Sequence, residues 1–235
     1  MTLLRCALVG VVLATSTALA ETTAITYSLA NTDGLRPNGV AVAAAEFKGR
    51  AAVEVRMLRD LAGGDSNTLA LIEGTDFQDG VIEFDVASRV NPDSWFFVRW
   101  FARGFVGVAF RTSADLRRFE CIYLRPTNGR ADDPERRMHA VQYFSYPDYD
   151  FRRFRDEAPG QYEASADIGP DEWIRVKIVV DGSTARLFVN NAADPTLVVE
   201  DLKHGPGARG AVGLWVDAGT IAHFSNLRIT PLVRR

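Results

Sequence analysis

Apolar residues stand at alternate positions in many short stretches of this chain, and Gly, Pro, Asp and Asn fill the gaps between the stretches. In 174–180, for example, Ile or Val occupies every second position, with Arg175 and Lys177 between them. A period of two predicts a strand with one buried face. An Asp-Gly-Ser turn at 181–183 then leads into a second apolar stretch at 185–189, which predicts a β-hairpin.

No stretch carries the apolar stripe of a long helix, and short strands recur at regular spacing instead. This pattern predicts an all-β protein built as an antiparallel sandwich or barrel. Trp173 and Trp215 stand in such strands and are predicted to be core residues. The segment 127–166 is too long for an ordinary connection, and we predict that it is a loop that carries function. The expected strands are 40–47, 51–57, 69–73, 81–87, 105–111, 119–125, 173–180, 185–189, 197–200, 211–216 and 223–230.

The first twenty residues have the features of a signal peptide. A short positive start is followed by apolar and small residues, and the stretch ends in Ala-Leu-Ala at 18–20, the pattern of a signal peptidase site. We therefore expect 1–20 to be removed, which leaves 21–235 as a single domain exported to the periplasm or secreted. The alternative is an uncleaved N-terminal anchor. Cys121 would then be the only cysteine, so the core must hold the domain together without an internal disulfide.

Charge and composition narrow the range of partners. The net charge of −3 argues against nucleic acid, which binds to a basic surface. The stretch 136–155 combines five arginines with six Phe or Tyr rings. Rings offer an apolar face and arginine offers a planar fork, so we interpret this stretch as a rim that presents both to a polyol ligand. Alternatively, these arginines pair with nearby aspartates and stack on the rings, and the loop is tied down by its own side chains.

From Phe105 onward the sequence resembles a known family. The resemblance rests, in order, on the segments GFVGVAFR, FECIYLRPTNGRADDPERR, HAVQYFSYPDYDFRRFR, YEASADIGPDEWIRVKIVV and GAVGLWVDAGTIAHFSNLRI. These are similar to an exported bacterial family of concanavalin A-like, laminin G-like jelly-roll domains, related to 3-keto-disaccharide hydrolases and to glycoside hydrolase family sixteen. The resemblance is dense over 105–230 and weaker over 35–90, and 95–101 departs from the family pattern. It implies an antiparallel two-sheet jelly-roll sandwich.

The resemblance also implies where a ligand would bind, namely on a concave sheet face or on the loops at its rim. Glu120 and His139 match family positions and are the candidates for catalysis. The remaining matches, with Tyr146 from the arginine-rich stretch, give the predicted ligand-binding residues Arg111, Tyr123, Arg125, Asn128, Arg130, Gln142, Tyr143 and Tyr146. We expect one cleft, with a carbohydrate or other polyol as its ligand, to contain Tyr123, Arg125, Gln142 and Tyr143.

The sequence leaves catalysis open. Glycoside hydrolysis needs two carboxyl groups close to the same bond, and Glu83 and Asp85 share one face of their strand. Ala87 and Ser88 stand where the partner carboxylate would be needed, so we predict no hydrolysis of ordinary β-glucans. Three functions remain to be distinguished. They are an exported carbohydrate-binding module, a glycosidase-like hydrolase or lyase that includes cleavage of 3-keto-glycosides, and a non-catalytic protein-interaction module.

The ring-rich stretch 91–104 has two interpretations. It is either a strand buried on both faces or a loop that exposes its rings, because a short apolar run does not distinguish them by period alone. An exposed patch of this kind would mark a binding surface. In that case we expect a protein partner at Trp95, Phe96, Phe97 and Trp100.

The sequence predicts neither a metal site nor a cofactor. His139, His204 and His223 are not spaced as zinc ligands, and too few cysteines are present for a zinc ribbon. A structural calcium ion would suit the expected fold, but no motif supports one. No apolar stretch after the first twenty residues is long enough to span a bilayer.

Overall fold

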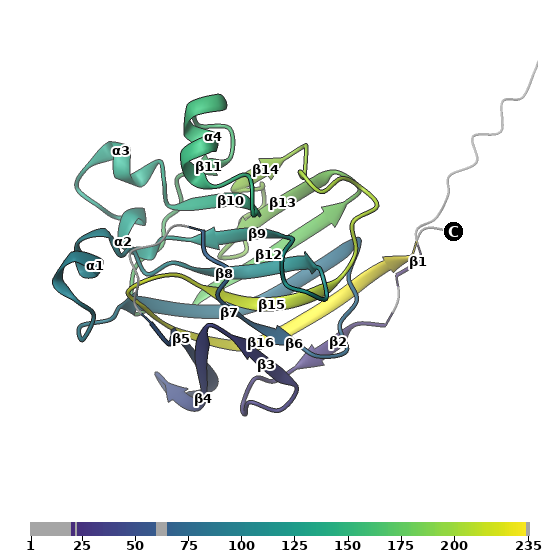
Figure 1. Ribbon diagram of the computed structural model, residues 1–235, viewed down its shortest axis with the longest axis horizontal. Coiled ribbons are helices and arrows are strands. Elements are labelled where there is room, and N and C mark those ends of the chain that lie inside the picture. The colour runs from purple at the N-terminus through teal and green to yellow at the C-terminus, as the bar shows by residue number, and fades with distance from the viewer. Residues whose placement is uncertain (1–19, 22, 60–64, 234–235) are drawn as a thin grey trace, which may run out of the picture.

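Two antiparallel β-sheets pack face to face as a sandwich in the computed structural model, which describes residues 20–21, 23–59 and 65–233 (Figure 1). The predicted all-β sandwich is therefore confirmed. Most of the predicted signal segment, 1–19, lies outside the described residues. In the described part of the chain, no helix has the length and apolar character that a membrane crossing requires.

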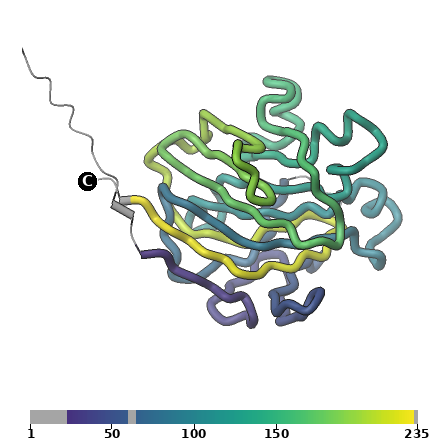
Figure 2. The backbone as a smooth tube through the Cα atoms, turned by 180° about the vertical axis from the view of Figure 1, so that it is seen from behind, coloured from purple at the N-terminus to yellow at the C-terminus, as the bar shows by residue number. Residues whose placement is uncertain are grey.

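The larger sheet contains the long C-terminal strand and its neighbours. Its strands are β1 (Ala20–Glu21), β2 (Ile25–Tyr27), β4 (Val40–Phe47), β5 (Arg50–Met57), β7 (Gly80–Val90), β12 (Ile174–Asp181), β13 (Thr184–Val189), β14 (Leu197–Val199) and β16 (Thr220–Val233). The order is β14-β13-β12-β7-β16-β5-β4, and β1 and β2 also pair with β16. Figure 2 shows this sheet from behind, with β16 in yellow beside β7.

The smaller sheet carries the segments with the densest family resemblance. Its strands are β3 (Leu35–Asn38), β6 (Leu69–Ile72), β8 (Val106–Thr112), β9 (Phe119–Leu124), β10 (Val141–Tyr146), β11 (Glu163–Ala164) and β15 (Ala211–Val216). They lie in the order β11-β10-β9-β8-β15-β6-β3.

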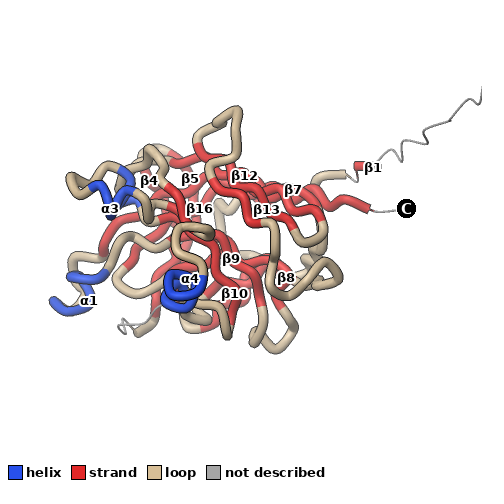
Figure 3. The backbone as a smooth tube through the Cα atoms, turned by 90° about the horizontal axis from the view of Figure 1, so that it is seen from above, coloured by secondary structure: helices blue, strands red, loops and turns tan. Residues whose placement is uncertain are grey.

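Short helices occupy connections between strands. They are α1 (Phe96–Phe101), α2 (Pro126–Gly129), α3 (Pro134–Arg137) and α4 (Phe151–Glu157). The first three lie at the end of the sandwich remote from β1 (Figures 1 and 3). The segment 127–166, predicted as one long loop, instead contains β10 and β11 as paired strands of the smaller sheet. That prediction is corrected, because only the parts around β10 are connections.

Burial follows the predicted alternation in β12, where Ile174, Val176 and Ile178 are buried and the residues between them are half-buried. Trp215 is fully buried, as predicted. Trp173 is only half-buried, so its assignment to the core is wrong. It lies on the outer face of the larger sheet, where Phe47 covers it edge-on with ring centroids 5.6 Å apart.

The two faces of the smaller sheet point in different directions because successive residues of a strand alternate between faces. Tyr123 of β9 pairs across the sheet with Gln142 of β10 and with Gly107 of β8, and Gly107 also pairs with Trp215 of β15. These residues therefore share one face. A side chain at Gly107 would place its Cβ 2.6 Å from the Tyr123 Cα and Cβ, so the close approach of β9 leaves room only for glycine there.

Candidate functional site

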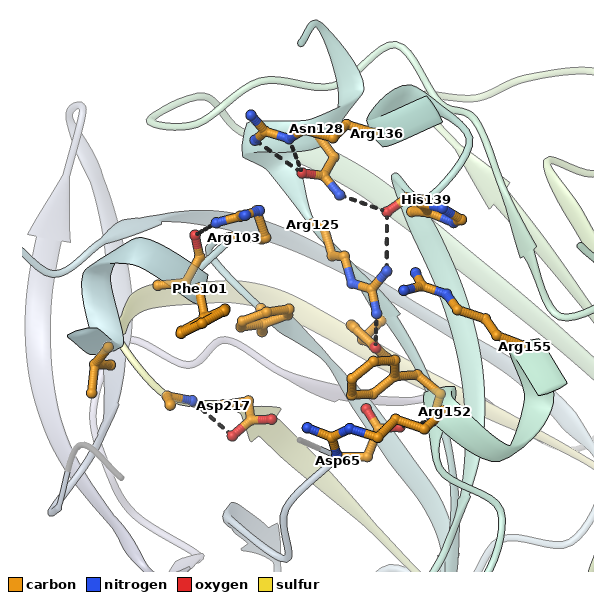
Figure 4. A pocket seen from close by; sticks show the side chains of 16 residues that line it. Asp65, Phe101, Arg103, Arg125, Asn128, Arg136, His139, Arg152, Arg155 and Asp217 are labelled. Atoms are coloured by element: carbon orange, nitrogen blue, oxygen red, sulfur yellow. Dashed lines mark hydrogen bonds between the residues drawn. The ribbon is translucent and has the colours of Figure 1, made fainter. Parts of the chain in front are cut away.

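A cavity of about 380 Å³ lies against this face, at the end of β9 (Figure 4). Its walls come from segments that are far apart in the sequence. The helix α1 and the residues after it contribute Val98, Phe101, Ala102, Arg103 and Phe105. Strand β9 and the segment that follows it contribute Tyr123, Arg125, Asn128, Arg136 and His139. Helix α4 contributes Phe151, Arg152 and Arg155, and two further connections contribute Asp65, Asp217 and Ala218.

Arg125 follows β9 directly and organises the polar side of the cavity. Its Nη2 donates to the Tyr123 hydroxyl at 2.6 Å and to Gln142 Oε1. Because Tyr123 and Gln142 are a cross-strand pair, the register of the sheet brings all three side chains into one hydrogen-bonded group. Tyr123 and Arg125 line the cavity, whereas Gln142 lies behind them and is 1% exposed. Gln142 therefore holds Arg125 and Tyr123 in place.

Positive charge is in excess around the cavity. Among the described residues, five arginines line it. Arg103 and Arg136 donate to uncharged oxygens, namely backbone carbonyls and the Asn128 side chain. Burial lowers the pKa of Arg103, and the positive charges of Arg136 and Arg125 lower it further. Like charges thus repel one another across the cavity, which is an arrangement that an anionic ligand would relieve.

Glu163 of β11 is the carboxylate that balances part of this charge. It is buried and accepts three hydrogen bonds from Arg155, from Nε at 3.1 Å and 3.3 Å and from Nη2 at 2.9 Å. Its Oε2 also lies 2.7 Å from His139 Nδ1 and 3.7 Å from Arg125 Nη1. Burial alone would raise the pKa of Glu163, but the hydrogen bond and charge of Arg155 outweigh it and the pKa is lowered. One ionised carboxylate is therefore shared by three basic side chains.

Two further carboxyl groups, those of Asp65 and Asp217, line the cavity with only 5% and 2% of their surface exposed. Within the described residues neither forms an ion pair, although buried carboxylates are ordinarily paired. Burial raises the pKa of Asp65 to about 7. The positive charge of Arg125 works against this shift, and the negative charge of Asp217 adds to it. Burial also raises the pKa of Asp217.

Asp65 and Asp217 are not among the residues predicted from the sequence, and the sequence signal that marks them is faint. Asp217 directly follows the apolar stretch of β15, and Asp65 follows two glycines. Acids at the ends of buried strands are common in turns, so neither position predicts a site without the fold. The lining residues Phe151, Arg152 and Arg155 do belong to the stretch that was interpreted as a ligand-facing rim.

Glu120 and Tyr143 face the larger sheet and do not line the cavity. The Tyr143 hydroxyl donates to Glu120 Oε2 at 2.7 Å. Glu120 Oε1 accepts a hydrogen bond at 2.8 Å from the backbone N–H of His204, a residue in the connection after β14. Both side chains are fully buried. Tyr143 adjoins Gln142 in β10, so it points to the opposite face. The expectation that Tyr143 shares a cleft with Gln142 is corrected for this reason.

Three other predicted residues make contacts outside the cavity. Arg111 is buried, and its guanidinium donates to Asp79 and to three backbone carbonyls, one of them in the turn between β12 and β13. Arg130 forms ion pairs with two acids at the surface. Tyr146 stacks on Phe119 with ring centroids 5.0 Å apart. Of the predicted residues, the cavity therefore contains Tyr123, Arg125, Asn128 and His139 in its lining.

The ring-rich stretch 91–104 is not a buried strand but exposes its rings, as the second interpretation expected, although 96–101 is helical rather than a loop. It forms the short helix α1, which only Val98 anchors by burial. Between 63% and 78% of the surface of Trp95, Phe96, Phe97, Trp100 and Phe101 is exposed. The rings therefore lie at the surface beside the cavity, to which Val98 and Phe101 contribute.

The described residues offer no metal centre. In that part of the chain no three His, Cys, Asp or Glu side chains are grouped so that they could hold a metal ion. Cys121 is buried in the smaller sheet, and burial raises the pKa of its thiol. The chemistry available at the cavity is that of carboxyl, guanidinium, imidazole and phenol groups.

Comparison with known proteins supports the fold. No protein-family model matches the sequence, and no curated protein matches it. Among solved structures it is similar to the carbohydrate-binding module CBM66 from Bacillus subtilis, with 15% identity and a TM-score of 0.55 over 83% of this chain and 95% of that one. A Bacillus subtilis protein of unknown function with a galectin-like fold is similar with 14% identity and a TM-score of 0.57 over 93% and 100%.

These similarities concern architecture. They confirm the lectin-like jelly roll, the sandwich on which carbohydrate-binding modules and galectin-like proteins are built. At such low identity a shared fold does not transfer a ligand or a reaction. The narrower resemblance to 3-keto-disaccharide hydrolases and to glycoside hydrolase family sixteen stays a prediction.

Proposed function

We propose that this protein binds an acidic carbohydrate, such as an oligosaccharide of uronic acids, in the cavity at the end of β9. The observation that supports this most directly is the group of arginines around one concave space, where burial and then the charges of Arg136 and Arg125 disfavour the charged form of Arg103. A carboxylate or sulfate on the ligand would accept hydrogen bonds from these guanidinium groups and offset their repulsion.

The apolar walls favour a sugar over a small inorganic anion. Phe101, Phe105 and Phe151 line the cavity together with the arginines. Rings pack against the C–H face of a sugar while the arginines reach its charged substituent. The volume, about 380 Å³, is within the ordinary range of small-molecule sites. A jelly roll with such a cavity matches the predicted carbohydrate-binding module, with the ligand class now narrowed to acidic sugars.

Export of the protein is part of the proposal and rests on the signal-like segment 1–20. The family resemblance points the same way. Acidic polysaccharides occur outside the cell as wall, capsule and matrix components, so an exported binding protein would meet its ligand there.

Isothermal titration calorimetry can test the binding proposal. The full chain is titrated with trigalacturonate, with an alginate trimer and with neutral galactotriose. We expect heat of binding for an acidic trimer, none for the neutral one, and weaker affinity as salt concentration rises. Arg155→Gln removes a charged donor at the wall and is expected to weaken binding about tenfold or more. Arg186→Gln, on the exposed face of β13, is the matched control and should leave affinity unchanged.

Two results would contradict the proposal. One is equal affinity for the neutral and the acidic trimers. The other is displacement of the acidic trimer by sulfate at an equal concentration, because a site that reads only charge would not need the sugar. If Arg155→Gln binds the acidic trimer as tightly as the wild type, the ligand does not bind in this cavity.

A further inference from the structure

Asp65 and Asp217 are not explained by the binding of an anion. Acidic groups beside an anionic ligand weaken its binding, and an ion pair with an arginine would satisfy them better than burial does. Instead both carboxyls line the cavity almost completely removed from water, and no cation among the described residues forms an ion pair with either. Unpaired buried carboxyls in a concave site indicate a chemical role.

The two carboxyl groups have different surroundings. Asp217 Oδ1 accepts hydrogen bonds from the Ser66 hydroxyl at 3.1 Å and from the Ala218 N–H at 2.7 Å, which favour the ionised form. Asp65 Oδ2 accepts from the Phe151 N–H at 2.6 Å, at the start of α4. With burial the dominant influence, the pKa of Asp65 reaches about 7 and the group keeps its proton in weakly acidic solution. Figure 4 shows both groups on the same side of the cavity, below Arg125.

We infer that Asp65 and Asp217 are an acid and a base that hydrolyse a glycosidic bond of the acidic carbohydrate held by the arginines. This inference rests on the proposed function. Asp65 transfers its proton to the glycosidic oxygen as the bond from that oxygen to the anomeric carbon breaks. Asp217 takes a proton from a water molecule as the water oxygen bonds to the same carbon. The proton then returns from Asp217 to Asp65 through solvent, and the net reaction consumes one water per bond.

This pair differs from the carboxylates that the sequence brought into question. Glu83 and Asp85 lie on β7 of the larger sheet, where Arg175 pairs with both. Glu120 is closed off between the sheets. An acid needs a raised pKa, and burial in the cavity wall raises that of Asp65. The surrounding arginines restrict the substrate to acidic glycosides, in agreement with the expectation that ordinary β-glucans are not hydrolysed.

The test combines product analysis with binding. The full chain is incubated with trigalacturonate, an alginate trimer and 4-nitrophenyl glucuronide in ¹⁸O-labelled water, and products are measured by mass spectrometry. We expect one labelled oxygen per bond cleaved. Asp65→Asn and Asp217→Asn are each expected to lower the rate about a hundredfold or more while calorimetry shows that the acidic trimer still binds. Asp194→Asn, at an exposed turn, is the control.

The outcomes separate this inference from the proposed function. Binding without any labelled product would overturn the acid–base pair and leave the binding proposal standing. Absence of binding to every acidic probe would refute the proposed function itself. An unsaturated product without label would show that the bond is broken by elimination. That result would overturn hydrolysis and make His139 the candidate for the base. Full activity in both variants would remove the two carboxyls from the mechanism.

The exposed rings of α1 carry a second and independent inference. Phe96 and Phe97 meet with an interplanar angle of 74°, and Phe96 and Trp100 with one of 44°. A sugar chain stacks on rings that lie in one plane, so this cluster is not a sugar platform. The helix has no acidic residue in its first turn, Arg99 lies in its last turn, and Arg103 follows. Rings that protrude in several directions with arginines beside them suit an anionic bilayer surface.

The geometry points to α1 as a contact with anionic lipid that places the cavity near a membrane surface. Co-sedimentation with vesicles of phosphatidylglycerol and phosphatidylcholine is expected to exceed that with phosphatidylcholine alone. The double variant Phe97→Ala/Trp100→Ala should reduce binding about tenfold or more, whereas Leu58→Ala, which also removes an exposed apolar side chain, should not. Absence of vesicle binding would overturn this inference. So would self-association in the ultracentrifuge that the double variant abolishes, because a second copy would then cover α1.

Discussion

The Asp65→Asn substitution is expected to stabilise the fold at neutral pH. Burial raises the pKa of this carboxyl from its ordinary value of 3.8 to about 7. In the unfolded chain the group loses its proton above pH 3.8, whereas the folded chain retains it until about pH 7. Rising pH therefore favours the unfolded state over that interval. The shift corresponds to about 4 kcal/mol in the free energy of unfolding.

The sign and the size of the effect can both be measured. Below pH 3.8 the carboxyl is neutral in both states, and the wild type has its full stability from this group. Between that pH and about 7 the wild type loses about 1.4 kcal/mol per pH unit, and above it the loss is complete. Asparagine does not ionise, and its Oδ1 can still accept from the Phe151 N–H. The variant should therefore exceed the wild type by an amount that grows with pH.

Urea unfolding of both chains at four pH values between about 4 and 8 provides the assay. The difference in the free energy of unfolding should be small near pH 4 and approach about 4 kcal/mol near pH 8. Thermal melts should show the same trend, with an increase of about 10 °C at the upper end. Asp194→Asn should show no such trend. If the curves of Asp65→Asn and the wild type run parallel across the range, the carboxyl is not buried as described and its proposed role as an acid fails with it.

Four further outcomes are expected. Glu163→Gln should lower stability by about 2 kcal/mol in urea unfolding, because Arg155 loses its charged partner, yet it should tighten binding of an acidic trimer; weaker binding would contradict the charge argument. Trp215→Ala should cost about 3–5 kcal/mol, and an unchanged melting temperature would refute its place in the core. The hydrolysis rate should fall as pH rises through about 7, where Asp65 ionises, and a rate that rises there would assign the acid elsewhere. Intact-mass analysis of secreted material should show a chain that begins near Glu21, and a mass that retains the first twenty residues would remove the export prediction.

The fold could be predicted where burial leaves one face of a strand polar. In β12 charged residues alternate with apolar ones, and the pattern gives both the strand and its inner face. The strand β10 was missed because Val141 through Ser145 are all buried. A strand covered on both faces has no polar alternation to detect. The exposure of the rings of α1 could not be predicted for the opposite reason, because interpretation of a sequence pattern assumes that large apolar side chains are buried.

The cavity could be predicted only where its residues are neighbours in the sheet. Tyr123 and Gln142 are paired on adjacent strands and Arg125 directly follows β9, so residue type and strand register bring the three together. Asp65 and Asp217 come from connections more than a hundred residues apart, and nothing local marks either as buried. The unusual feature of the two carboxyl groups is their burial in the cavity wall, and this wall exists only once folding has placed Phe151 and Tyr123 around them. Chemistry that depends on burial is therefore invisible until the chain has folded.

Two features of the cavity raise the free energy of the folded chain, and packing explains neither. Arg103 is held near two other positive charges, and Asp65 is buried without an ion pair among the described residues, so that the charge of Arg125 offsets the effect of burial only in part. A stable jelly roll could be built with neutral residues at both positions, so their presence indicates function at the expense of stability. An acidic glycoside accounts for both at once, because its carboxylate reduces the repulsion among the arginines and its glycosidic oxygen accepts the proton that burial keeps on Asp65. A neutral sugar would leave the arginines repelling one another, and a simple anion would leave Asp65 without a role.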